Sequence, residues 1–114
     1  MPEKIDEIMT FDISKIFIPK EPGIYLMKDN SGNTIYIGKA KNLRNRVKTY
    51  FTKNQNYKTQ KLVSKISDIE FVLTDNESEA FLLESNMIKR YRPTYNIELK
   101  DQQRYTYLRI TNEK

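Results

Sequence analysis

The residue with the clearest chemical potential is Glu84, a carboxylate inside an otherwise apolar helical stripe. A helix over residues 77–91, turning about 100° per residue, would carry its apolar residues on one side, namely Ala80, Leu83, Met87, Ile88 and Tyr91. Glu84 falls within that stripe, where a carboxylate loses its hydration at considerable cost. Glu84 is therefore either paired with a cation at a packed edge, or it binds a metal ion or faces a cleft.

The sequence contains no histidine and no cysteine, which restricts the chemistry available to it. A general base near neutral pH must then be a carboxylate, a lysine, one of the eight tyrosines or water on a metal ion. The absence of cysteine excludes disulfides, thiolate metal sites and a cysteine nucleophile. It also fits a reducing compartment, so we expect a cytoplasmic protein.

Three further side chains could take part in chemistry. Arg46 follows Leu43 by three residues and precedes Tyr50 by four, which turns it toward the apolar side of a helix. It either points toward a sheet or extends along the surface with its charge in solvent. Tyr25 and Tyr36 fall in predicted strands, where each could equally be an ordinary strand aromatic.

A β-hairpin is predicted to position the two tyrosines. The runs 23–28 and 34–38 are apolar, aromatic and β-branched, and a cluster of turn-forming residues separates them at 29–33. The register stays open. If the numbers of paired residues sum to 61, Tyr25 faces Tyr36, whereas a slip of one residue places them on opposite faces of the sheet.

The remaining elements follow from periodicity and turn signals. We predict a basic amphipathic helix over 42–50, a polar loop over 52–56, a short helix around 62–66, a strand over 69–74 and a strong helix over 77–91. Residues 105–111 read as a fourth strand or an extended arm. The expected fold is mixed α/β (α+β), with a small, mainly antiparallel sheet flanked by helices, preceded over 1–20 by a short helix and a packed lead-in.

Composition favours one compact domain with a polyanionic partner. The chain has 114 residues and a net charge of +5, from 20 lysines and arginines against 15 acids. It contains no apolar run long enough to span a membrane, and its first residues do not resemble a signal peptide. These features suit a nucleic-acid partner, and one interpretation is a noncatalytic nucleic-acid-binding module that uses a basic helix and exposed tyrosines.

Two strings resemble the signature of the GIY-YIG nuclease family. They are Gly23-Ile24-Tyr25 and Tyr36-Ile37-Gly38. The second continues to Phe51 as a sequence similar to the UvrC branch of that family, and a later stretch over 79–96 is similar too. The resemblance covers about residues 20–110 and implies a GIY-YIG nuclease domain over 21–114. The string from Lys39 to Phe51 argues against a homing or structure-specific member of the family.

The resemblance implies roles for particular residues. Glu84 matches the glutamate that ligates a single divalent cation, Mg²⁺ or Mn²⁺, and Tyr36 matches the proposed general base. That base would need its proton relayed, or its pKa lowered by Lys39 or the metal. Arg46 matches the arginine that steadies charge on the scissile phosphate. The other matched active-site positions are Tyr25, Lys39, Tyr50 and Asn96, which would orient the base, the phosphate or the metal shell.

The resemblance also implies a biological role. It predicts metal-dependent hydrolysis of a phosphodiester 3′ to a lesion in damaged double-stranded DNA, during nucleotide excision repair. UvrC proteins usually continue into further domains, so we expect this chain to be an excised domain. It would be monomeric alone, would not associate with a membrane, and would work with a UvrB-like loading protein through the full-length chain. Gly38 would let backbone approach the cleft where a side chain would obstruct it.

Overall fold

A three-stranded antiparallel sheet forms the centre of the protein. The computed structural model describes residues 11–52 and 55–97. Strand β1 (Gly23–Lys28) lies between β2 (Thr34–Ala40) and β3 (Asp68–Leu73), so β2 and β3 are the two edge strands. The helices are η1 (Ile13–Lys15), α2 (Leu43–Thr49), α3 (Tyr57–Lys65) and α4 (Glu77–Tyr91). The predicted α+β fold is confirmed.

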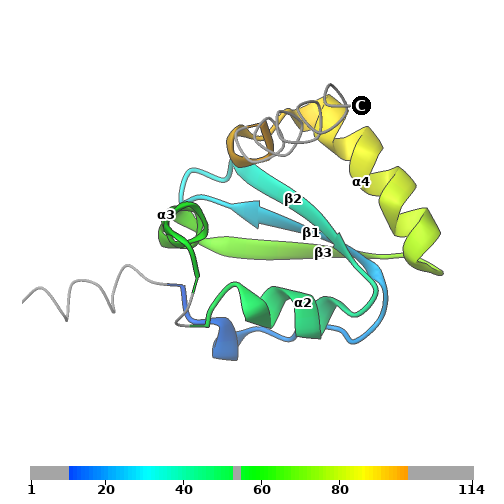
Figure 1. The fold of residues 1–114 in the computed structure, drawn as a ribbon, viewed down its shortest axis with the longest axis horizontal. Coiled ribbons are helices and arrows are strands. Elements are labelled where there is room, and N and C mark those ends of the chain that lie inside the picture. Colours follow the sequence, from blue (N-terminus) through cyan, green and yellow to red (C-terminus); the bar gives the residue numbers. More distant parts are fainter. Residues whose placement is uncertain (1–10, 53–54, 98–114) are drawn as a thin grey trace, which may run out of the picture.

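Helices α2 and α4 cover opposite faces of the sheet (Figure 1). On one face, Leu43 and Val47 of α2 pack in a core that includes Tyr25 and Met27 of β1. On the other face, Ala80 of α4 packs against Ile24, Leu26 and Ile37 of the sheet. None of the helices among the described residues is long and apolar enough to cross a membrane. Side chains of α2 therefore reach β2 from one face of the sheet, and side chains of α4 reach it from the other.

The hairpin has a register that neither sequence prediction gave. Tyr25 lies opposite Gly38 and Met27 lies opposite Tyr36, a shift of two residues from the register that pairs the tyrosines directly. The reason is local. The Asp29 carboxylate accepts hydrogen bonds from the amides of Ser31 and Asn33, and a register irregularity follows Met27. A shift of two keeps Tyr25 and Tyr36 on one face as diagonal neighbours.

Helix α4 begins and ends at the predicted residues, because its sequence carries strong caps. The Asn76 side chain accepts the Glu79 amide at 2.8 Å, and the Glu79 carboxylate accepts the Asp75 amide at 2.6 Å. Arg92 then adopts a left-handed conformation with φ of 47° before Pro93, which ends the helix. The predicted stripe is wrong at Tyr91, the last residue of α4, which is 51% exposed.

The lead-in differs in part from prediction. Among its described residues the helix is limited to the 3-10 turn η1, with Asp12 as its N-cap, and Ile18 is buried while Phe17 is 76% exposed. The predicted helix residues Ile5 to Met9 lie outside the described residues. The strand or arm predicted over 105–111 also lies outside them.

Candidate active site

Three tyrosines from β1, β2 and the end of α2 meet on the α2 face of the sheet. We call Tyr25, Tyr36 and Tyr50 the tyrosine cluster. The Tyr25 and Tyr50 hydroxyls share a hydrogen bond of 2.7 Å, and their rings lie edge to face with centroids 5.7 Å apart. The Tyr36 ring lies 6.3 Å from that of Tyr25 and 6.2 Å from that of Tyr50. The structure therefore brings together three residues that the sequence spreads over 26 positions.

Gly38 is what allows the Tyr25 ring to reach the other tyrosines. The two residues are cross-strand partners, and a Cβ atom placed on Gly38 would collide with the ring and hydroxyl of Tyr25. The Tyr25 ring thus crosses β2 directly over the glycine. The prediction was that Gly38 lets the backbone approach the cleft. In the structure, Gly38 instead leaves room for the Tyr25 phenol against the backbone of β2.

Arg46 joins the tyrosine cluster from α2. Its guanidinium donates a hydrogen bond of 3.3 Å to the Tyr50 hydroxyl and lies 4.9 Å from the centre of the Tyr50 ring. Burial lowers the pKa of Arg46, but the nearby Tyr25 and Tyr50 phenols outweigh that effect and raise it. Arg46 combines the two alternatives, because the residue is exposed to solvent while its guanidinium lies against Tyr50. It places a permanent positive charge beside three hydroxyls.

The hydroxyls of the tyrosine cluster all hold their protons tightly. Burial raises the pKa of Tyr25 to about 12, with a further increase from the neighbouring Tyr36. Burial also raises the pKa of Tyr36, helped by the charge and hydrogen bonding of Tyr50 and by the charge of Glu84, while Arg46 opposes the shift. Tyr50 behaves in the same way, because burial and the charge of Tyr25 raise its pKa. All three phenols are therefore neutral near pH 7.

Glu84 is buried, as its position in the stripe predicted, with 8% of its surface exposed. Its charge contributes to the raised pKa of Tyr36, so the two groups are electrostatically coupled although they come from α4 and β2. The coupling is possible because β2 is an edge strand against which α4 packs. Within residues 11–52 and 55–97, no group of three or more acids, histidines or cysteines gathers into a metal cluster.

Asn96 anchors the outer edge of β2. Its side-chain oxygen accepts the Ile37 amide at 2.6 Å, and its side-chain nitrogen donates to the Ile37 carbonyl at 2.8 Å. Asn96 is 1% exposed. The Asn96 side chain thus makes the two hydrogen bonds with Ile37 that a neighbouring strand would otherwise make. In this structure Asn96 acts on the site by holding β2 in place.

Lys39 does not lie with the tyrosine cluster. Lys39 is opposite Ile24 in the β1–β2 register, whereas Tyr36 is opposite Met27, so their side chains leave β2 on opposite faces. The Lys39 ammonium lies 3.6 Å from the Glu77 carboxylate at the start of α4. The expectation that Lys39 lowers the pKa of Tyr36 is therefore wrong, and the neighbouring cation that opposes the shift is Arg46.

Comparison with solved structures defines the class of the protein. The chain matches the crystal structure of the GIY-YIG N-terminal endonuclease domain of UvrC from Thermotoga maritima bound to its catalytic divalent cation, magnesium. The TM-score is 0.64 at 41% identity, covering 83% of this chain and 98% of that one. A point mutant of the same domain, also bound to its catalytic divalent cation, matches equally well. The fold is thus that of a GIY-YIG endonuclease domain.

Sequence comparison narrows that class. A family model of the UvrC-like GIY-YIG domain matches residues 21–97, and the chain belongs to this family. UvrABC system protein C of Methanococcus maripaludis is 55% identical over 97 residues, which cover 84% of this chain and 18% of that protein. The Oenococcus oeni protein is 54% identical over 97 residues, covering 85% and 16%. The chain therefore spans less than a fifth of the length of these relatives.

Proposed function

We propose that this domain is a divalent-metal-dependent endodeoxyribonuclease that cuts DNA 3′ to a lesion during nucleotide excision repair. The observation that carries the proposal is a buried carboxylate, Glu84, on the helix that packs against β2. On its other face, the same strand brings Tyr36 to the other two tyrosines and to Arg46. Family membership and the magnesium-bound Thermotoga relative support the same reading.

Glu84 fits one hard divalent cation. Mg²⁺ keeps several of its waters and binds through one or two carboxylates together with substrate phosphate, so a single buried glutamate suffices without an acidic cluster. The Glu84 carboxylate would hold Mg²⁺, or Mn²⁺ in its place, at the β2 edge. When bound, the ion supplies positive charge against the phosphate oxygens and makes water more acidic.

Tyr36 would receive the proton of the attacking water as a new phosphorus–oxygen bond forms. A backbone phosphorus–oxygen bond breaks at the same time, and its leaving oxygen takes up a proton from solvent. The raised pKa of Tyr36 means that this residue starts the reaction with its own proton in place. That proton must therefore pass onward, or positive charge beside Glu84 must lower the pKa of Tyr36 when the site is loaded. Tyr50 offers a route for transfer, because its hydroxyl interacts with Tyr36 and bonds to Tyr25.

The other residues would bind and orient the substrate. Arg46 would contact the scissile phosphate with its terminal nitrogens and balance the charge that builds up there. Tyr25 and Tyr50 would hold the Tyr36 ring and the Arg46 guanidinium in place. Lys39, about one third exposed on the other face, would reach a phosphate beside the cut, and Asn96 would keep β2 in register.

Incision of a lesion-bearing duplex tests this proposal. The duplex would be preloaded with a UvrB-like partner and treated, with Mg²⁺ present, with full-length protein carrying the native residue, Glu84→Gln or Glu79→Gln. The Glu79 variant is matched, because it removes one negative charge from the same helix while a glutamine can still cap Asp75. We expect Glu84→Gln alone to lose the 3′ cut while it still joins the DNA complex. Equal cutting by all three full-length proteins would show that the 3′ cut does not need Glu84, and would favour a noncatalytic binding role for this domain.

A further inference from the structure

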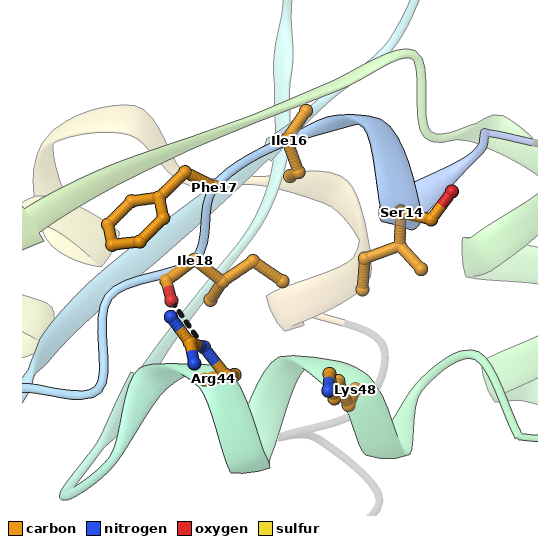
Figure 2. Close-up of a pocket in the computed structure, with 7 residues that line it drawn as sticks. Ser14, Ile16, Phe17, Ile18, Arg44 and Lys48 are labelled. Atoms are coloured by element: carbon orange, nitrogen blue, oxygen red, sulfur yellow. Dashed lines mark hydrogen bonds between the residues drawn. The ribbon is translucent and has the colours of Figure 1, made fainter.

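A basic and aromatic pocket lies between α2 and the lead-in segment, apart from the tyrosine cluster. It has a volume of about 320 Å³. Among the described residues that line it, the charged ones are Arg44 and Lys48, and both are cations. Figure 2 shows both rising from α2 toward the segment that carries Phe17 and Ile18. At the rim, the Ser14 hydroxyl donates to the Asp12 carboxylate, which places one negative charge near the two cations.

Arg44 and Phe17 are held together although both are at the surface. The Arg44 Nε donates a 2.8 Å hydrogen bond to the Ile18 carbonyl, which fixes the guanidinium 5.4 Å from the centre of the Phe17 ring. That bond leaves the terminal nitrogens of Arg44 available to a ligand. Phe17 remains 76% exposed, an unusual state for a large aromatic side chain next to an ordered cation. A flat apolar surface and a positioned positive charge thus share one pocket.

The pocket lies on the far side of α2 from Arg46. At about 100° per residue, Arg46 points about 160° around the helix from Arg44 and from Lys48. A DNA backbone that passes beside α2 would therefore meet Arg46 on one side of the helix and the pocket on the other.

We propose that Phe17, Arg44 and Lys48 form a DNA subsite for the backbone that flanks the cut. Arg44 and Lys48 would each contact a phosphate, and the exposed face of Phe17 would pack against a deoxyribose. The positive charge of the lining favours a polyanion over an apolar protein segment. The inference rests on the proposed function in taking DNA as the substrate, but it assigns residues outside the tyrosine cluster.

The salt dependence of DNA binding tests this subsite without relying on cutting. The probe is a fluorescein-labelled DNA duplex, titrated with the 114-residue chain in EDTA over a range of salt concentrations. Arg44→Gln combined with Lys48→Gln should weaken binding about tenfold at low salt and reduce the slope of log K against log salt by about 1.8. Phe17→Ala should weaken binding about threefold and leave the slope unchanged, because it removes no charge.

A matched control removes one lysine and one arginine elsewhere. Lys89→Gln combined with Arg90→Gln, both exposed on α4, should leave affinity and slope nearly unchanged. An equal loss in both double variants would overturn the subsite in favour of a general charge effect. Normal DNA binding by the variant with both Arg44 and Lys48 replaced would also overturn the subsite. If that variant instead loses affinity for a UvrB-like protein, the pocket binds protein and not DNA. The readout is DNA binding in EDTA, so a failure of the catalytic proposal would show separately, in the incision assay.

Discussion

Replacement of Asn96 by alanine should destabilise the domain through its effect on one backbone residue. The substitution removes two hydrogen bonds, at 2.6 and 2.8 Å, and leaves the Ile37 amide and carbonyl without their partner. Each bond contributes about 1 kcal/mol net, and an unsatisfied buried group costs about 1 to 3 kcal/mol. Because Ile37 and Asn96 are both buried, the two groups lose their partner away from solvent, and we expect a loss of about 2 to 6 kcal/mol in the free energy of unfolding.

Urea unfolding followed by circular dichroism measures this loss, and amide hydrogen exchange locates it. Exposed Asn86 on α4 provides the control, since Asn86→Ala should change the free energy of unfolding by less than about 0.5 kcal/mol. Asn96→Asp should be at least as destabilising at neutral pH, because its ionised carboxylate would be buried and would face the Ile37 carbonyl without donating to it. If Asn96→Ala unfolds like the native chain, and the Ile37 amide exchanges equally in both, the anchor does not exist.

Three further predictions concern the tyrosine cluster. Gly38→Ala should destabilise the fold by about 1 to 3 kcal/mol, because the added Cβ atom would collide with the Tyr25 ring. Urea unfolding measures this loss, and an unchanged free energy of unfolding would refute the contact. The tyrosines of the cluster have raised pKa values in the folded state, so the folded protein keeps its full stability below pH 10.0, the ordinary tyrosine pKa. Its free energy of unfolding should fall as the pH rises toward about 12, the pKa of Tyr25 in the folded state. Phenolate absorbance of the folded protein should therefore lag behind that of the unfolded chain, and coincident titrations would contradict the burial of these hydroxyls. Arg46→Lys should lower the incision rate about a hundredfold with little change in unfolding, because lysine lacks the planar fork, whereas full activity would exclude a bidentate phosphate contact.

The elements were predictable because local chemistry specifies them. Helix α4 has an asparagine cap, acids in its first turn, basic residues in its last turn and a proline beyond its end, so its bounds could be predicted from the sequence. The two strands of the hairpin were likewise indicated by apolar runs around a cluster of turn residues. Burial of Glu84 followed from helical spacing alone.

The missing parts depend on geometry that is not local. Lys39 and Tyr36 face opposite sides because they lie three residues apart on β2, which extends to Ala40 and not only to the predicted residue 38. The pairing of Tyr36 with Met27 depends on the Asp29 turn and the irregularity after Met27. The contact of Asn96 joins residues 59 positions apart, so no periodicity could indicate it. The pairing of Phe17 with Arg44 likewise had no sequence signal beyond the residue types.

The central claim is that Glu84 and Tyr36 border one metal site at the edge of β2. Paramagnetic broadening by Mn²⁺ tests it most directly, with NMR amide signals recorded for the native chain, Glu84→Gln and Glu79→Gln. We expect substoichiometric Mn²⁺ to broaden the signals of Glu84 and Tyr36 first in the native and Glu79→Gln chains, and to leave them sharp in Glu84→Gln. Broadening that begins elsewhere, or that survives in Glu84→Gln, would contradict the account.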